Sequence, residues 1–301
     1  MGNPVVRPSG ASDSGRLSDD PGSSGPHAER WTRGPSWTGD TLANRTALVT
    51  GAASGIGAAL AAELRSREAT VLTTDIEGEF DHRLDVRHQD DWQRVLSDTG
   101  VPDFLFANAG ISMGGPTQEL TRAHWDRIID VNLNGVVNGL LEVYPAMVER
   151  GSGHIVITAS GAGLAAPPFV TAYAATKHAV VGLGLGLRSE AALYGVRVSI
   201  LCPGAVDTPI LDRSPPSDLP NTRSKPVTAR QYLSLLNQKP VSADRFARLA
   251  LDRIARDQAI ICVPVAAKSL WYLHRLSPSL VARVSKLIAK RVDHHLLGGG
   301  N

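Results

Sequence analysis

Short apolar runs alternate with amphipathic stretches over most of the chain. Apolar runs typical of buried strands occupy residues 46–50, 70–74, 104–106, 154–158 and 197–201. Between them, residues 58–67 and the segments that begin at Arg122 and Tyr173 carry the spacing of helices. Strands that alternate with helices imply parallel βαβ crossovers, with helices on both faces of one sheet. The pattern therefore predicts an α/β fold, a Rossmann-type doubly wound and mostly parallel sheet, over residues 45–264.

The two ends of the chain depart from this alternation. Residues 1–40 contain seven Gly, seven Ser and five Pro, and their few large apolar residues show no period. We therefore expect residues 1–44 to form a disordered extension. Near the other end, the apolar run 259–267 predicts a buried strand. Residues 265–301 follow as a separate segment, for which the spacing predicts a basic amphipathic helix.

The C-terminal segment combines an apolar stripe with a cationic face. Residues 265–295 hold six Lys or Arg and a single acidic residue, Asp293. Its apolar side chains recur at helical spacing: Leu280, Val284, Leu287, Ile288 and Val292. Such a helix can dock on its own domain or on a sister subunit, or it can lie on an anionic membrane surface. We favour docking on protein and leave peripheral membrane contact open.

Composition and charge narrow the class of protein. The chain has 301 residues, of which 43% are hydrophobic and 20% charged, as is ordinary for globular proteins. A net charge of +2 lacks the concentrated basic excess of nucleic-acid binders, so we expect no nucleic-acid partner. Cys202 and Cys262 show no metal-binding spacing, which favours reduced thiols in a cytoplasmic protein without a metal site. No apolar stretch reaches the ~20 residues that span a bilayer.

A glycine-rich turn joins the first predicted strand to the first predicted helix. It contains Gly51, Gly55 and Gly57. Glycines let the backbone approach a pyrophosphate, and the helix N-terminus supplies free N–H groups and the positive end of a dipole. Asp75 ends the second strand, where a carboxylate binds the ribose hydroxyls of NAD and repels the 2′-phosphate of NADP. The turn therefore predicts a dinucleotide site that prefers NAD.

Further motifs follow this turn along the chain. Asn108-Ala109-Gly110 comes after a predicted strand, Ser160 precedes Tyr173-xxx-Lys177 by thirteen residues, and Pro203-Gly204-Ala-Val206-Asp-Thr208 comes after another strand. In this order the motifs resemble those of the short-chain dehydrogenase/reductase family, in its single-domain branch. The resemblance covers about residues 45–264 and departs at Ala107, where members usually carry Asn. It implies an oxidoreductase that acts on CH–OH groups.

The resemblance also implies which residues contact the cofactor. Asp85-Val86 is similar to the pair that contacts the adenine ring, and the stretch from Pro203 is similar to the one that holds the nicotinamide amide. The full set of implied cofactor contacts is Gly51, Ser54, Gly55, Ile56, Gly57, Asp75, Asp85, Val86, Asn108, Ala109, Gly110, Tyr173, Lys177, Pro203, Gly204, Val206 and Thr208.

Tyr173 and Lys177 are the candidate acid/base pair. Four residues apart on one helix, they share a face. A free Tyr has a pKa of about 10 and is a poor base at pH 7. A neighbouring ammonium and a positive nicotinamide favour the phenolate, which predicts a lowered pKa for Tyr173. Ser160 can donate to the substrate oxygen, and the resemblance assigns Asn132 to a proton relay.

Three glycines interrupt the helix that carries Tyr173. Gly182, Gly184 and Gly186 each cost about 1 kcal/mol there relative to Ala. Close helix packing, for example against a second subunit, explains their presence. The family resemblance implies homodimers or homotetramers formed by these helices.

The segment after Ser160 suggests the class of substrate. It contains apolar residues such as Leu164 and Ala165, and Met113 adds to the predicted pocket, so we expect an apolar alcohol or ketone. The leading hypothesis is an NAD-dependent alcohol dehydrogenase or ketone reductase. One alternative is an NADP(H)-preferring carbonyl reductase of the same fold, against which Asp75 argues. Another is a non-catalytic dinucleotide-binding scaffold, which would have no need for the Ser, Tyr and Lys.

Overall fold

The predicted alternation of strands and helices runs through the described chain. The structure is a computed structural model that describes residues 42–213, 216, 218–220, 222, 228–264 and 266–296, all within one compact unit. The disorder expected of residues 1–44 falls on residues that, up to 41, lie outside this description. The strands are β1 (Thr46–Thr50), β2 (Thr70–Asp75), β3 (His82–Arg83), β4 (Phe104–Ala107), β5 (Gly153–Thr158), β6 (Val196–Pro203), β7 (Val206–Asp207), β8 (Val241–Ser242) and β9 (Ile260–Val263).

The helices begin and end close to the predicted positions. The helix of Tyr173, for example, begins two residues earlier, at Thr171. The α-helices are α1 (Gly55–Ser66), α2 (Gln89–Thr99), α3 (Arg122–Ile129), α4 (Gly135–Arg150), α5 (Thr171–Ala191), α6 (Ala229–Leu235), α7 (Ala243–Ile254), α8 (Ala266–Leu276) and α9 (Pro278–Leu296). Short helical turns are η2 (Thr117–Glu119), the π-helical η3 (Asp130–Asn134), η4 (Gly161–Gly163), η5 (Ala192–Tyr194) and η6 (Pro209–Leu211).

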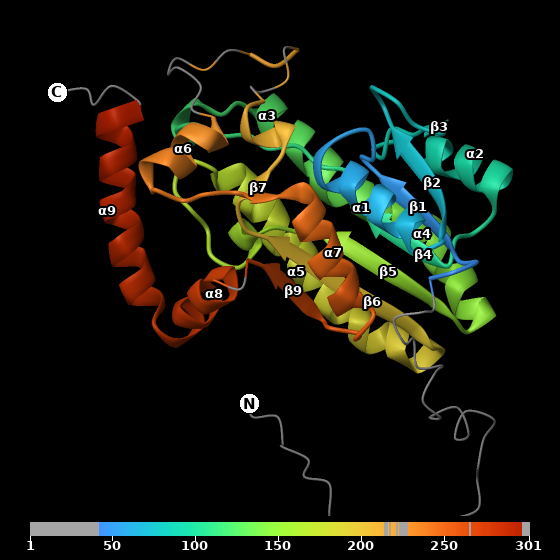
Figure 1. Cartoon of the computed structure of the whole chain (residues 1–301). Helices are drawn as coiled ribbons and strands as arrows, with labels where there is room; N and C mark the ends of the chain where they lie inside the picture. Colours follow the sequence, from blue (N-terminus) through green and yellow to red (C-terminus); the bar gives the residue numbers. More distant parts are fainter. Residues whose placement is uncertain are drawn as a thin grey trace, which may run out of the picture. The chain divides into compact units, whose positions relative to one another are not determined.

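One parallel sheet forms the centre of the described chain (Figure 1). Its strand order is β3-β2-β1-β4-β5-β6-β9, and each pair of neighbours is parallel. The chain proceeds outward from β1 to β3 and then returns to continue on the other side of β1, from β4 to β9. The predicted Rossmann-type sheet is therefore confirmed. Ligands bind such sheets at the carboxyl ends of the strands, where the order reverses, between β1 and β4.

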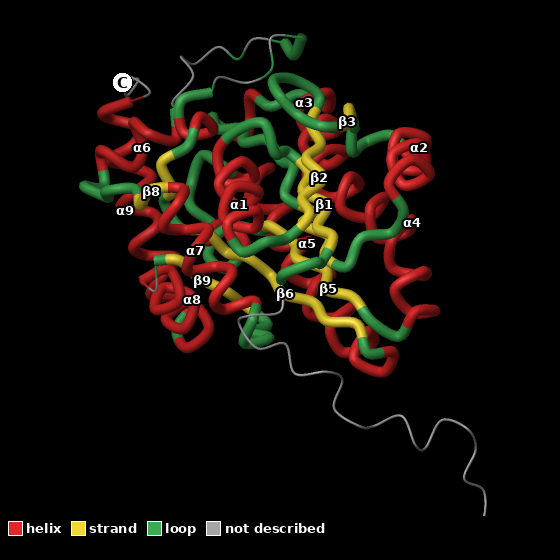
Figure 2. Tube along the Cα trace, turned by 45° about the vertical axis from the view of Figure 1, so that its right-hand side comes forward, coloured by secondary structure: helices red, strands yellow, loops and turns green. Residues whose placement is uncertain are grey.

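Each face of the sheet carries its own apolar core (Figure 2). Helices α1 and α7 pack on one face through buried residues such as Leu60 and Phe246. Helices α2, α4 and α5 cover the other face through Trp92, Val143 and Val180. Burial on both faces explains why the strands read as continuous apolar runs rather than as alternating ones.

The apolar run 259–267 is only partly a strand. It pairs with β6 over Ile260–Val263, which places Cys262 beside Cys202. Helix α8 begins at Ala266, so the prediction of a strand up to residue 267 was wrong. Pro264 lacks a backbone N–H and cannot extend the ladder. The two cysteines are free and buried, as the sequence predicted.

The C-terminal segment folds as two helices rather than one. Helix α8 contacts β9 and η4, and α9 contacts α8 and α6 (Figure 1). Val292 is fully buried, whereas Leu280, Val284 and Leu287 are exposed. Docking of the predicted apolar stripe on its own domain is therefore confirmed for Val292 and contradicted for these three residues.

Within residues 42–213, 228–264 and 266–296, no helix combines the length and the apolar character needed to cross a membrane.

Candidate active site

In the glycine turn after β1, the backbone packs closely against itself and against the segment that follows β4. Gly51 and Gly55 have φ of +66° and +58°, the left-handed region that favours glycine. A Cβ at Gly57 would lie 2.1 Å from the Gly51 carbonyl oxygen, and one at Gly51 would lie 2.8 Å from Ala109 Cα. Side chains at these positions would therefore open the turn or push β4 away from β1.

The start of α1 leaves its N–H groups available. Ser54 is the N-cap residue in an extended conformation, and its side chain makes no capping hydrogen bond. The first turn, which contains Ile56, carries no acidic residue. Unpaired N–H groups and the helix dipole together favour an anion at this point, as the turn sequence predicted.

Asp75 is fixed against the glycine turn by two backbone donors. Parallel pairing of β1 with β2 aligns Thr50 with Thr74, so Asp75 follows at the same edge of the sheet. Its Oδ2 accepts from the Ala53 N–H at 3.0 Å and its Oδ1 from the Ile76 N–H at 2.8 Å. The carboxylate therefore stands at the mouth of the turn, where an adenosine ribose would lie.

The segment after β4 is tied to the end of β1. Asn108 Nδ2 donates to the carbonyl oxygens of Thr50 and Gly51 at 3.0 and 3.3 Å. Thr50 Oγ1 in turn accepts from the N–H groups of Asn108 and Ala109, both at 3.0 Å. Thr50 is a site residue that the sequence reading did not single out. A buried Thr in a strand looks like a packing residue, and only the neighbouring strand reveals its hydrogen bonds.

Asn132 is a fully buried bridge between three segments of chain. It lies in the π-helical turn η3 between α3 and α4. Its Oδ1 accepts from the Ile111 N–H at 2.8 Å, and its Nδ2 donates to the Ile111 carbonyl at 3.0 Å and to Thr176 Oγ1 at 3.1 Å. Asn132 thereby connects the end of β4 to the helix that carries Tyr173.

Ser160, Tyr173 and Lys177 come together at the carboxyl end of β5. Ser160 caps η4, and its Oγ accepts from the Ala162 N–H at 3.1 Å. The Ser160 hydroxyl also lies close enough to the Tyr173 phenol to lower the pKa of that phenol. Lys177 is buried, donates to the Thr158 carbonyl at 2.9 Å and lies 5.7 Å from the centre of the Tyr173 ring.

The pKa of Tyr173 shifts in the direction opposite to the one predicted. Burial raises it above the ordinary value, and the nearby Ser160 hydroxyl offsets this only in part. The Lys177 ammonium points at the Thr158 carbonyl instead of the phenol oxygen, and burial lowers its own pKa to about 8. The predicted lowering by Lys177 was therefore wrong for the protein's own groups. Burial in the protein favours the protonated form of the Tyr173 phenol.

Gly110 brings the cofactor segment up to the acid/base pair. A Cβ at Gly110 would lie 3.2 Å from Asn132 Oδ1 and 3.3 Å from Lys177 Nζ. The glycine turn, Gly110 and Lys177 are thus continuous in space, although they are far apart in the sequence. The carboxyl ends of β1, β4 and β5 create this continuity because parallel strands end at one edge of the sheet.

The stretch after β6 completes the crevice. The Gly204 N–H donates to the Val263 carbonyl at 2.9 Å, which fixes the chain after Pro203. Val206 is buried and pairs with Val241. A Cβ at Gly55 would lie 3.2 Å from Thr208 Cβ, so this stretch contacts the glycine turn.

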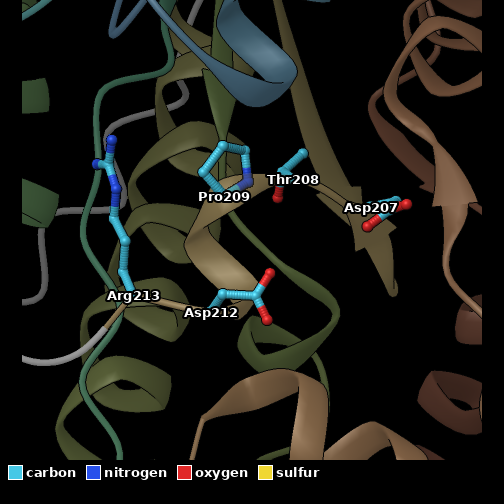
Figure 3. A pocket seen from close by; sticks show the side chains of 5 residues that line it. All are labelled: Asp207, Thr208, Pro209, Asp212 and Arg213. Carbon is cyan, nitrogen blue, oxygen red and sulfur yellow. The ribbon is translucent and has the colours of Figure 1, made fainter.

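A pocket of about 580 Å³ opens at this stretch (Figure 3). Its lining residues are Asp207, Thr208, Pro209, Asp212 and Arg213. Arg230 of α6 pairs with Asp207 at 2.8 Å and with Asp212 at 2.7 and 2.8 Å, so it ties α6 to the pocket wall. Of these residues the sequence reading named only Thr208 as a site residue. No sequence signal links Arg230 to carboxylates 18 and 23 residues away.

Asp85 and Val86 lie further out, after the edge strand β3. Arg87 binds the Asp85 carboxylate through Nε at 2.9 Å and through Nη2 at 2.6 Å, and this ion pair lowers the pKa of Asp85. Val86 packs against Gly135, where a Cβ would lie 2.6 Å from Val86 Cγ2. These contacts leave the role of the pair toward adenine as an expectation from the resemblance.

The apolar residues predicted to line the substrate pocket lie in two different places in the structure. Leu164 and Ala165 are buried, Leu164 belongs to the core under the sheet, and neither residue lines the pocket beside Thr208. Met113 is buried in a small cluster with Ile128 and Ala172, against which Tyr173 and Leu219 pack. An apolar surface therefore does lie beside the Tyr173 ring.

The three glycines of α5 differ in their surroundings. A Cβ at Gly184 would lie 2.6 Å from Ile200 Cγ1, so this glycine permits packing on the chain's own sheet. At Gly182 and Gly186 a Cβ would meet no described atom within 4 Å. Leu185 between them is 37% exposed, and Leu141 of α4 is 59% exposed.

The sequence of this chain is similar to those of known oxidoreductases. Residues 45–218 match the family described as short chain dehydrogenase. The chain is 31% identical over 245 residues to a D-beta-hydroxybutyrate dehydrogenase of Rhizobium meliloti, which covers 72% of this chain and 94% of that protein. It is 33% identical over 194 residues to a levodione reductase of Leifsonia aquatica, covering 57% of this chain and 73% of the relative.

A solved structure agrees over a larger part of the chain. The crystal structure of a short chain dehydrogenase/reductase from Burkholderia phymatum, in complex with NAD, superimposes with a TM-score of 0.70 at 30% identity. The superposition covers 79% of this chain and 95% of that one.

Proposed function

This chain belongs to the short-chain dehydrogenase family and is an oxidoreductase, and from that premise we propose that it transfers a hydride between NAD and an alcohol or ketone, with Tyr173 as the acid/base. The observation that carries the proposal is the continuity of Gly110, Lys177 and Tyr173 at the carboxyl ends of β4 and β5. A scaffold protein would not require a hydroxyl, a phenol and an ammonium at this position.

The residues of the glycine turn fit a dinucleotide. The space that side chains would fill at Gly51 and Gly57 is occupied by backbone, and the first turn of α1 presents free N–H groups without a competing carboxylate. Asp75 at the end of β2 suits the two hydroxyls of a ribose and would repel a 2′-phosphate, which favours NAD over NADP. When bound, NAD supplies the acceptor or donor of the hydride.

The side chains around Tyr173 fit proton transfer to a carbonyl. A phenol with a raised pKa keeps its proton until the substrate oxygen becomes negative. The Ser160 Oγ, which accepts from the Ala162 N–H, can turn its own hydrogen toward the same oxygen. Lys177 holds positive charge beside the phenolate that forms, and Asn132 and Thr176 hold the segments that carry these groups in register.

The apolar cluster at Tyr173 supports a substrate with an apolar portion. Met113 belongs to the apolar cluster against which Tyr173 and Leu219 pack, whereas Asp207 and Asp212 of the adjacent pocket both pair with Arg230. We therefore keep the predicted apolar alcohol or ketone as the substrate class. The cytoplasmic location stays part of the proposal, supported by two free thiols.

The exposed face of α5 supports a homo-oligomer. Gly182 and Gly186 leave space for another helix to approach closely, Leu185 offers an apolar side chain between them, and Leu141 of α4 is exposed as well. We expect two copies to pack α4 and α5 against each other, as a dimer or as half of a tetramer. Mass measurement in solution tests this, and a Gly182→Leu variant should weaken association.

A cofactor titration and a substrate screen test the function. NADH should bind more tightly than NADPH, and turnover with NADH should appear on apolar ketones before sugars or polyols. Binding of neither dinucleotide would end the proposal. Tighter binding of NADPH would overturn the cofactor choice alone, and turnover confined to sugars or polyols would overturn the substrate class alone.

A further inference from the structure

The two C-terminal helices carry most of the exposed large apolar side chains of the described chain. We call α8 and α9 together the C-terminal hairpin. Of the eleven large hydrophobic residues that are exposed, six lie in this hairpin: Tyr272 (50%), Leu273 (40%), Leu276 (84%), Leu280 (44%), Val284 (46%) and Leu287 (68%). Large apolar side chains that are exposed on two helices in mutual contact mark a candidate interaction site.

The apolar stripe of α9 packs on the protein only near the C-terminal end of the helix. Val292 is buried and Ile288 partly buried in this packed part. Leu280, Val284 and Leu287 are spaced four and three residues apart, so they continue the same apolar stripe toward the start of the helix, where packing on the domain leaves it uncovered. Helix α9 therefore presents apolar surface to something beyond its own domain.

The charge of the hairpin identifies the kind of partner. The single acidic residue among 266–296 is Asp293, and the basic residues are Lys268, Arg275, Arg283, Lys286, Lys290 and Arg291. Within the described residues none of these six forms an ion pair, whereas Arg67, Arg87 and Arg230 of the remaining domain each pair with a carboxylate. Exposed leucines beside unpaired cations suit a surface that is both apolar and anionic.

The aromatic residues of α8 lie beside cations, which also suits a surface that is both apolar and anionic. Arg275 Cζ lies 5.4 Å from the Trp271 ring centre, and Lys268 Nζ lies 5.8 Å from that of Tyr272. Tyr272 is half-exposed, whereas Trp271 is partly buried and packs against the core of the domain. Aromatic rings with neighbouring cations are typical of the boundary between headgroups and acyl chains.

We propose that the C-terminal hairpin docks this protein on the surface of an anionic phospholipid bilayer. A second copy of the chain is the rival occupant, but a symmetric contact would bring two strongly cationic hairpins together, which like-charge repulsion opposes. The sequence pattern alone favoured docking on protein. The exposure of three of its five apolar positions reverses that preference.

Docking would bring elements that border the proposed active site close to the bilayer. Helix α9 contacts α6, whose Arg230 reaches the pocket wall, and α8 contacts η4, which follows Ser160 (Figure 1). Docking through the hairpin would therefore place α6 and η4, which border the proposed site, next to the lipid-bound helices. This inference does not rest on the proposed reaction.

Co-sedimentation of the full chain with vesicles tests the proposal. The protein should sediment with vesicles of phosphatidylglycerol and phosphatidylcholine, should not do so with phosphatidylcholine alone, and should be released by high salt. Lys286→Gln/Lys290→Gln should weaken partitioning about 30-fold, since each surface cation contributes about fivefold. Leu280→Ser/Leu287→Ser should weaken binding as well, because less apolar surface enters the lipid.

Matched controls separate membrane binding from general effects. Arg245→Gln/Arg256→Gln removes two exposed cations of the domain, and Leu193→Ser removes an exposed leucine outside the hairpin. Both should bind vesicles like the unaltered protein, and all variants should keep its melting temperature. Equal binding to neutral vesicles, or no binding to anionic ones, would overturn the proposal. So would leucine variants that alter only the solution mass, because the partner would then be a second copy.

Discussion

The carboxyl end of the sheet buries polar side chains, whereas the C-terminal hairpin exposes apolar ones. At the sheet, Asn132 and Lys177 are buried, and each finds partners within the chain. In the hairpin, Leu276 and Leu287 are exposed at 84% and 68%. Burying a polar group without a partner is costly, and so is leaving apolar surface in water. In the first region, hydrogen bonds within the chain offset the cost of burying polar groups. In the second region, only an external partner can cover the apolar surface.

This difference separates two kinds of functional signal. Buried polar residues with complete hydrogen bonds indicate a site whose geometry the fold itself maintains. Exposed apolar residues with unpaired cations indicate a site that is complete only in an assembly. Substitutions should therefore affect turnover or stability in the first region and association in the second.

The largest expected effect belongs to the phenol. Tyr173→Phe removes the proton that a substrate oxygen needs, so turnover should fall by roughly 10²–10⁴-fold. The binding of NADH should remain close to that of the unaltered protein, because the glycine turn and Asp75 are untouched. Steady-state kinetics and a fluorescence titration measure the two quantities. Equal turnover in the variant would remove Tyr173 from the mechanism.

The buried bridge at Asn132 should show the next largest effect. Asn132→Ala leaves the Ile111 N–H and C=O groups and Thr176 without their partner, which should lower the free energy of unfolding by roughly 2–4 kcal/mol. Asn134→Ala, two residues away and exposed, should change it by less than about 0.5 kcal/mol. Denaturant unfolding compares them, and similar losses would contradict the special place of Asn132.

Lys177 should impose opposite pH trends on activity and stability. Burial lowers its pKa from 10.5 to about 8. Above pH 8 the ammonium beside Tyr173 is lost, so ketone reduction should decline by up to about tenfold per pH unit. Between pH 8 and 10.5 the folded chain binds fewer protons than the unfolded one, so the contribution of Lys177 to stability should rise with pH.

A charge-preserving variant checks that assignment. Lys177→Arg stays protonated throughout this range and should lack the decline above pH 8, even if its maximal rate is lower. A pH–rate profile of both proteins provides the comparison. The same decline in the variant would assign it to another group.

The smallest expected effect is a difference in stability between the packed and the exposed parts of the apolar stripe on α9. Val292→Ala should lower local stability by roughly 1–2 kcal/mol, because it removes buried apolar surface. Leu287→Ala, on the exposed part of the stripe, should change it by less than about 0.5 kcal/mol in the absence of lipid. Hydrogen exchange of the α9 amides measures both. Comparable losses would show that this part packs on the chain after all.

The sequence predicted most of the fold because its signals are local. The strand from Thr46, the glycine turn and the helix of Tyr173 follow from period and turn chemistry within a dozen residues. Pro264 was a local signal as well, and it correctly marks the end of β9. Arg230 was missed because its carboxylate partners lie on another element.

By itself, the sequence determined the class of sheet, the glycine turn with Asp75, and the pairing of Tyr173 with Lys177 on one helix face. These depend on residue type and spacing, which are properties of the chain. The tertiary structure alone decided that burial raises the pKa of Tyr173, that Asn132 joins three segments, and that part of the apolar stripe of α9 faces away from the domain. Each of these depends on burial, and burial is set by which distant segments pack together.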